Sequence, residues 1–194
     1  GDYYMTKKNA IQDIYPLSYM QEGMLFHSLL QKESQLTPEQ APFSITGKVD
    51  TRVFEESVHA LFERHDIFRT IFISQNVSVP QQVVLKERFV SIIEENLTNL
   101  NKADQIKYIE EAKRRDREKG FHLQKDMLMR VTLLQTGECE YTCIWSFHHI
   151  IMDGWCLGIV LKEFFQITPR LRRTPLTLEP VCLPLRREPI HRLV

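Results

Sequence analysis

The chain has 194 residues, of which 43% are hydrophobic and 26% are charged, and this composition is typical of one globular domain with a sizeable core. Lysine plus arginine and aspartate plus glutamate both number 25, so the formal net charge at pH 7 is zero. The balance therefore predicts neither a nucleic-acid partner nor an anionic membrane partner. The sequence has no apolar run long enough for a membrane span and no signal-peptide core, so we expect no membrane segment.

The cysteines indicate a reduced protein. The sequence contains four, without a CxxC pair: Cys139, Cys143, Cys156 and Cys182. Two lie on or beside a predicted strand and one lies in an apolar predicted helix, so we expect free, buried thiols rather than disulfides or a zinc site. A reducing cytoplasm is the expected location.

The N-terminal part predicts a linker, a helix and a loop. Residues 1–10 are polar and without periodicity, as in a linker or tail. Ser18 and Gln21 form a capping-box pattern, which predicts a helix over residues 19 to about 31. A polar, proline-containing loop is expected over 34–42.

The next stretch predicts a strand, a helix and a hairpin. Apolar and polar residues alternate over 43–49, as in a half-exposed strand. Asp50 is suited to cap a helix that runs to Glu63. Residues 68–73 and 82–86 then favour two paired strands joined by a turn.

The second half predicts two helices around a hairpin. A long charged helix is expected over 102–119, ended by Gly120. Its apolar positions form a narrow stripe that should pack on the core: Ala103, Ile106, Ile109 and Ala112. Strands over 127–135 and 141–147 should form a hairpin, the second of them covered on both faces. A helix buried nearly all round should follow over 155–165.

Strands and helices alternate irregularly and include hairpins. This order predicts an α/β fold, a two-layer sandwich with a mixed β-sheet, rather than a doubly wound parallel sheet. No phosphate-binding glycine motif is present, so nucleotide binding has no support. Residues 168–194 are rich in proline and arginine and show no period, so we expect an irregular tail there, of either native or non-native origin. The folded unit is therefore predicted over 11–167.

The hairpin and the last predicted helix flank the sequence HHIIMDG at 148–154. A metal site would need a third ligand, and neither His122 nor Cys156 has a motif spacing to this turn, so no metal is predicted. A histidine with a pKa near ~6.5 can instead accept a proton at neutral pH from an attacking amine, hydroxyl or thiol. Backbone N–H groups at the start of the following helix can serve a developing oxyanion. The simpler alternative is that both histidines are structural.

Three separated blocks carry a resemblance to a known family. They read YPLSYMQEGMLF (15–26), RHDIFRT (64–70) and SFHHIIMDGW (146–155). The last block contains HHIIMDG, which matches the HHxxxDG motif of the chloramphenicol acetyltransferase-like acyltransferases. The flanking residues and the order of the blocks resemble the condensation domains of nonribosomal peptide synthetases, over about residues 11–167.

The resemblance implies a reaction and its partners. Condensation domains join a donor acyl or peptidyl thioester to the α-amine of an acceptor aminoacyl thioester and so form an amide. Both substrates arrive on the phosphopantetheine arms of carrier-protein domains, so no directly bound cofactor is expected. An adjacent adenylation domain is a further expected partner.

The resemblance also assigns roles to residues of the turn. It implies that His149 is catalytic, either as the base for the amine or as the group that positions the amine and stabilises the tetrahedral intermediate. It makes His148, Asp153 and Gly154 structural supports of the site. Trp155 becomes a candidate for the substrate tunnel.

Two further expectations concern residues outside the turn. Asp153 is expected to pair with an arginine of the second block, and we favour Arg69 over Arg64 because an arginine inside a strand needs a partner. His122 stands where the family usually has aspartate in an FDL motif, which puts a local contact in question but not the chemistry.

A complete condensation domain has two similar lobes, and this sequence resembles the N-terminal one. Catalysis needs both thioesters held close together, so we expect little condensation activity without the C-terminal lobe. An uncovered inter-lobe face would favour self-association. Two alternatives stay open: a single-lobe acetyltransferase that works as a homotrimer, and a non-catalytic interaction module.

Overall fold

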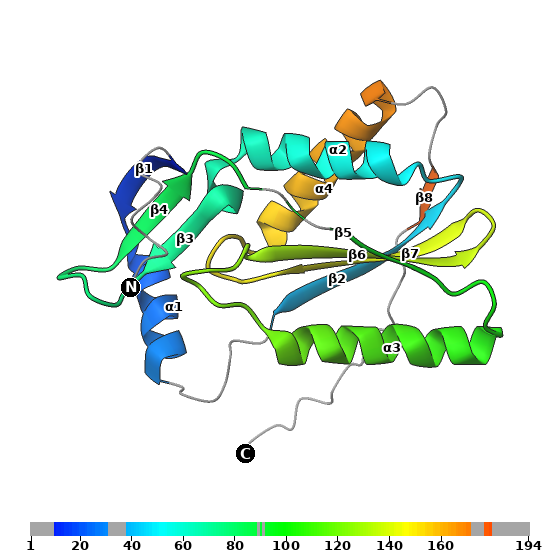
Figure 1. Ribbon diagram of the computed structural model, residues 1–194, viewed down its shortest axis with the longest axis horizontal. Coiled ribbons are helices and arrows are strands. Elements are labelled where there is room, and N and C mark those ends of the chain that lie inside the picture. The colour runs from blue at the N-terminus through cyan, green and yellow to red at the C-terminus, as the bar shows by residue number, and fades with distance from the viewer. Residues whose placement is uncertain (1–9, 31–37, 89, 91, 172–176, 180–194) are drawn as a thin grey trace, which may run out of the picture.

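The computed structural model describes residues 10–30, 38–88, 90, 92–171 and 177–179, and a five-stranded sheet forms its centre (Figure 1). The strand order is β5-β6-β7-β2-β8. The strands are β2 (Glu39–Thr46), β5 (Ile92–Asn96), β6 (Met129–Gly137), β7 (Glu140–Phe147) and β8 (Thr177–Glu179). β5 runs parallel to β6 and the other pairs are antiparallel, which confirms the predicted mixed sheet.

Strand β7 lies at the middle of the sheet and is covered on both faces, as predicted. Cys143 and Trp145 point into the main core, whereas Ile144 belongs to a smaller cluster on the other face. Helices α2 (Thr51–Arg64) and α4 (Gly154–Leu171) cover the side of the main core (Figure 1). Their aromatic residues meet there, because the rings of Phe54 and Trp145 both contact the ring of Phe164 edge-on.

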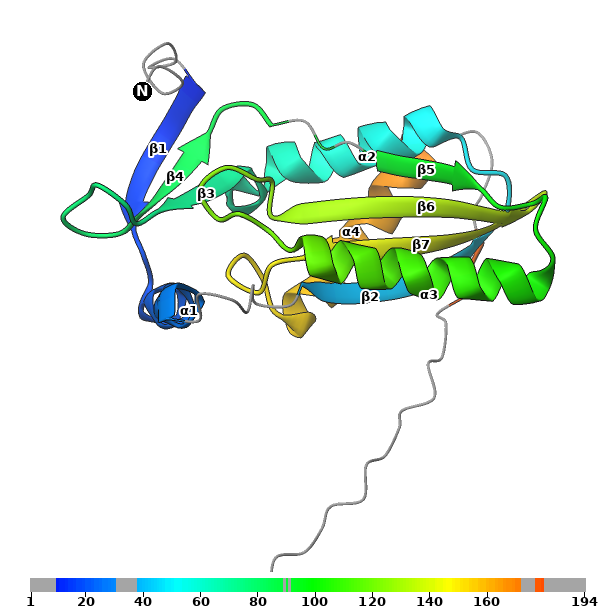
Figure 2. The same ribbon diagram turned by 60° about the horizontal axis from the view of Figure 1, so that its bottom comes forward.

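Helix α3 (Lys102–Lys119) lies on the opposite face, so it adds partial cover on the second side of the sheet (Figure 2). Of the predicted stripe, Ile109 and Ala112 pack on the sheet, but Ala103 is exposed and Ile106 is 57% exposed. The buried position is Gln105, whose amide donates to the carbonyls of Leu97, Leu100 and Thr136. These hydrogen bonds turn the Gln105 side of α3 toward the sheet, because buried carbonyls need donors. A pattern of hydrophobic residues cannot predict this orientation.

A second, three-stranded sheet has the order β1-β4-β3, with β1 (Ile11–Pro16), β3 (Thr70–Ile73) and β4 (Gln81–Leu85) all antiparallel. The β3–β4 hairpin was predicted, whereas strand β1 was not. Helix α1 (Tyr19–Leu30) follows β1 and begins with the predicted capping box. The backbone N–H of Ser18 donates to Gln21 Oε1 at 2.9 Å, and the N–H of Gln21 donates to Ser18 Oγ at 3.3 Å.

Other helix ends also follow their local signals. The Asp50 carboxylate caps α2 by accepting the N–H groups of Arg52 and Val53 at 3.1 and 3.3 Å. Helix α3 ends at Gly120, whose φ of 57° lies in the left-handed region that favours glycine.

Three predictions need correction. Strand β2 begins at Glu39, inside the expected loop, because it pairs with β7 over its whole length. Helix α4 continues to Leu171 and β8 pairs with β2, although an irregular tail was expected from residue 168; residues 172–176 and 180–194 lie outside the described part. Helix α4 is not buried all round, since Cys156, Gly158 and Ile159 are exposed.

The thiols also differ from the expectation. Cys143 is buried, and burial raises its pKa far above the ordinary value. Cys139 and Cys156 are free but exposed, and Cys182 lies outside the described residues.

Arg69 joins the three-stranded sheet to helix α2. It ends a short 3-10 helix (Asp66–Arg69) between α2 and β3, and it is only 6% exposed. Its Nε donates to the carbonyl of Phe62 at 2.8 Å, and one terminal nitrogen donates to the carbonyl of Leu85 at 2.5 Å. The other terminal nitrogen pairs with the Asp66 carboxylate at 2.5 Å. The guanidinium thus connects the end of α2 to strand β4.

Replacing Arg69 should therefore destabilise the fold, whereas the same change at Arg64 should not. Arg69→Lys keeps the charge but loses the planar fork, so we expect the free energy of unfolding to fall by about 1–3 kcal/mol. Arg64 is exposed and 3.7 Å from the Glu163 carboxylate, so Arg64→Lys should change the free energy of unfolding by less than about 0.5 kcal/mol. Urea denaturation of both variants checks this, and equal losses would refute the assigned role of Arg69.

Candidate active site

The turn at 148–154 connects the end of β7 to the start of α4. It lies at the end of the central sheet that faces α1 and the second sheet (Figures 1 and 2). At this end of the sheet, the first residue of β6, Met129, pairs with the last residue of β7, Phe147. The turn therefore follows a strand that is paired on both edges, with β6 and with β2.

His148 is buried and serves as the support of the turn. It is 3% exposed, and its backbone N–H donates to the Leu128 carbonyl at 2.9 Å. Its carbonyl accepts the N–H of Ile151 at 3.2 Å, and its ring Nδ1 accepts the N–H of Ile150 at 3.0 Å. Nδ1 is thus the unprotonated nitrogen. Burial, and to a smaller extent the neighbouring His149, lower the pKa of His148 to about 4, so the ring is neutral at pH 7.

His149 is exposed, in contrast to its neighbour. Its Nδ1 lies 3.1 Å from the Met152 carbonyl oxygen. A carbonyl only accepts, so this contact requires the proton on Nδ1 and leaves the lone pair of the neutral ring on Nε2. The tautomer is therefore set by a backbone group of the turn itself, a contact for which the sequence carries no signal.

Asp153 closes the turn by capping α4. Its carboxylate accepts the N–H of Cys156 at 2.8 Å, and its carbonyl accepts the N–H of Leu157 at 3.1 Å. The N–H of Cys156 is thus engaged by a carboxylate, and the expected use of this helix start for an oxyanion stays a prediction. Gly154 is exposed, and a Cβ there would meet no atom within 4 Å.

The expected ion pair between Asp153 and Arg69 is wrong. Arg69 pairs with Asp66, because the 3-10 turn places that carboxylate three residues before it. Arg64 and His65 instead contact Glu163 of α4, with His65 Nε2 2.6 Å from the carboxylate. The hydrogen bond to His65, followed by weaker contributions that include Arg64, lowers the pKa of Glu163.

Two other expected positions have different outcomes. The side chain of Trp155 lies outside what the structure describes, so its place near a tunnel stays a prediction. His122 replaces an aspartate of the family pattern, and its Nδ1 accepts the N–H of Gln124 at 3.3 Å. An aspartate oxygen can accept the same kind of local bond, so the departure is compatible with the turn.

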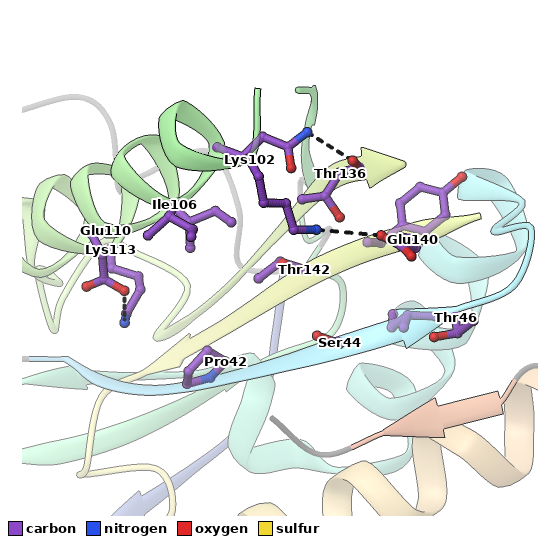
Figure 3. A pocket seen from close by; sticks show the side chains of 14 residues that line it. Pro42, Ser44, Thr46, Lys102, Ile106, Glu110, Lys113, Thr136, Glu140 and Thr142 are labelled. Atoms are coloured by element: carbon purple, nitrogen blue, oxygen red, sulfur yellow. Dashed lines mark hydrogen bonds and ion pairs between the residues drawn. The ribbon is translucent and has the colours of Figure 1, made fainter. Parts of the chain in front are cut away.

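A cavity of about 510 Å³ lies between α3 and the outer face of β2 and β7 (Figure 3). Two ion pairs border it, Lys102–Glu140 at 3.8 Å and Lys113–Glu110 at 2.9 Å. Its floor carries the hydroxyl side chains of Ser44, Thr46 and Thr142. None of its lining residues belongs to the histidine turn.

Within the described ranges, no group of three or more His, Cys, Asp and Glu residues is arranged to hold a metal ion. Among the same residues, no helix is both long and apolar enough to cross a membrane.

Comparison with known proteins decides the family. Residues 11–179 match the Condensation domain family. The chain belongs to the condensation-domain family. It is 67% identical over 178 residues to one of the plipastatin synthase subunits of Bacillus subtilis (strain 168), and the matched stretch covers 91% of the chain and 5% of that protein. This relationship confirms the family that the three sequence blocks resemble.

Solved structures share the fold of this condensation domain. The starter condensation domain of rhizomide synthetase RzmA has a TM-score of 0.72 and 21% identity, over 80% of this chain and 39% of that one. Holo-AB3403, a four-domain nonribosomal peptide synthetase bound to AMP and glycine, has a TM-score of 0.70 and 17% identity, over 81% of this chain and 12% of that one. The chain thus spans less than half of the matched solved chains and a small part of the matched plipastatin synthase protein, and it corresponds roughly to the N-terminal lobe.

The burial of His148 predicts how the stability of this lobe depends on pH. Because the folded pKa of about 4 lies below the ordinary 6.5, the unfolded chain takes up a proton first as pH falls. The free energy of unfolding should therefore decrease between pH 6.5 and pH 4, by about 2–3 kcal/mol from this residue.

His148→Asn should remove that decrease while keeping an acceptor for the N–H of Ile150. Chemical denaturation at several pH values measures it, with His27→Asn as the control, because His27 is exposed on α1. If His148→Asn retained the full decrease, the assignment of a buried neutral ring to His148 would be wrong.

Proposed function

We propose that this chain supplies the histidine-bearing lobe of a condensation domain, which forms an amide between a donor acyl or peptidyl thioester and an acceptor aminoacyl thioester. The observation that carries the proposal is the state of His149: exposed, with Nδ1 bound to the Met152 carbonyl and the lone pair left on Nε2. Family membership supports the reaction class.

The chemistry uses Nε2 of His149 at the attacking amine. The amine nitrogen bonds to the thioester carbonyl carbon as it loses a proton, which Nε2 accepts or holds by a hydrogen bond. The tetrahedral intermediate then collapses, the C–S bond breaks, and the proton passes to the departing thiolate. In the net reaction, one amide forms and one thioester becomes a thiol, without oxidation or reduction.

His148 and Asp153 support this chemistry without touching the substrate. The neutral ring of His148 places no positive charge beside His149, so it leaves the neighbouring imidazole free to accept a proton. Asp153 fixes the start of α4 after the turn. Both roles fit the structural assignments made from the family pattern.

The proposed partners follow from the surface and from the family. Helix α1 exposes large apolar side chains at the end of the molecule that carries the turn: Tyr19, Met20 and Phe26. We propose that a C-terminal lobe packs on these side chains and also brings the two thioesters together. Carrier domains with phosphopantetheine arms and an adenylation domain complete the proposed assembly, in the cytoplasm. The lobe alone should self-associate through this surface and show little condensation.

Substitution of His149 in a complete condensation domain that contains this lobe tests the proposal. With both thioesters loaded on carrier domains, His149→Ala should reduce amide formation by about 10²–10⁴-fold, measured by mass spectrometry of the carrier-bound product. His122→Asp, which restores the family residue, is the matched control and should keep the wild-type rate.

Two results would favour the alternatives. Unchanged amide formation by His149→Ala would make the lobe a non-catalytic module. A homotrimer of the present chain that turns over acetyl-CoA would make it a single-lobe acetyltransferase.

A further inference from the structure

A row of three side chains connects strand β6 to the histidine turn. The guanidinium carbon of Arg130 lies 4.1 Å from the ring centroid of Phe121, over its face. The Phe121 ring in turn meets the His148 ring edge-on, with centroids 6.4 Å apart and an interplanar angle of 75°. Phe121 directly follows Gly120, where α3 ends at the same end of the molecule as the turn (Figure 2).

Arg130 is held in one position by its other contacts. Its side chain is 14% exposed, and Nε lies 2.7 Å from the Asp116 carboxylate. One terminal nitrogen donates to the Gly120 carbonyl at 2.8 Å and the other to the Asp116 carbonyl at 3.1 Å. A guanidinium fixed on all three nitrogens gives Phe121 a rigid surface to pack on.

The same short part of the chain also holds His148 through its backbone. The Leu128 carbonyl, just before β6, accepts the N–H of His148 at 2.9 Å. Arg130, two residues later, lies opposite Ser146 of β7. The Leu128 backbone thus contacts His148 directly, and the Arg130 side chain is connected to His148 through the Phe121 ring.

We propose that Arg130 and Phe121 are positioning residues for the catalytic turn, a proposal that rests on the function assigned to His149. Phe121 restricts the His148 ring to the orientation in which Nδ1 accepts the N–H of Ile150. That bond sets the backbone of the turn up to Met152, whose carbonyl fixes the tautomer of His149. Arg130 acts on the turn only through Phe121.

Hydrogen exchange at the Ile150 amide tests the positioning without any substrate. In the present chain, Arg130→Gln and Phe121→Leu should each raise the exchange rate of this amide by about tenfold or more, measured by NMR. Arg117→Gln is the matched control, because Arg117 lies on the same end of α3 and donates to Gln40 Oε1 at 2.7 Å. It removes the same charge and should leave the Ile150 rate unchanged.

A kinetic test in the complete condensation domain separates positioning from substrate binding. Arg130→Gln and Phe121→Leu should lower kcat by about 10–100-fold with KM nearly unchanged, and Phe121→Tyr should restore the rate. Arg117→Gln should retain the wild-type kcat.

The outcomes are distinguishable. Ile150 exchange equal to that of Arg117→Gln in both test variants overturns the positioning role. If Arg130→Gln fails to fold, Phe121→Leu decides, because it keeps the Arg130–Asp116 ion pair. If the His149→Ala domain were active, the proposed catalytic role of His149 would be wrong. The exchange rate of the Ile150 amide would still show whether Arg130 and Phe121 hold the turn.

Discussion

The immobilisation of His148 is the constraint on which the site depends. Its backbone is held on both sides, by Leu128 and Ile151, and its ring accepts the N–H of Ile150. A ring used in this way must remain neutral, and burial keeps it so. The ring nitrogen Nδ1 of His148 is thus occupied by a backbone bond of the turn. In the exposed neighbour, His149, the Nδ1 contact leaves the lone pair on Nε2.

The surrounding fold holds the turn at both of its ends. It follows β7, which has neighbours on both edges and packed side chains on both faces, and it leads directly into the capped helix α4. Arg69 ties the second sheet to the end of α2, which in turn packs on α4. A lobe built in this way presents the exposed His149 imidazole at its end. The large apolar side chains of α1 stay exposed at the same end.

Elements with strong local signals were predictable from the sequence, and those set by distant partners were not. The alternation in β7, the Asp50 cap and the glycine after α3 act within a few residues, so the sequence shows them directly. Strand β2 extends to Glu39 only because β7 is there to pair with it. Arg69 was placed in a strand, which hid the 3-10 turn that brings Asp66 to it. The histidine motif identified the candidate residue, but its tautomer depends on the Met152 carbonyl, which any residue would provide.

The proposed chemistry requires that His149 carries its proton on Nδ1 and its lone pair on Nε2. Long-range ¹H–¹⁵N correlation NMR of the chain labelled with ¹⁵N-histidine measures this directly at a pH where the ring is neutral. The His149 resonances should show a protonated Nδ1 and an unprotonated Nε2, and those of His148 should show the reverse. A His149 ring protonated on Nε2 would contradict it.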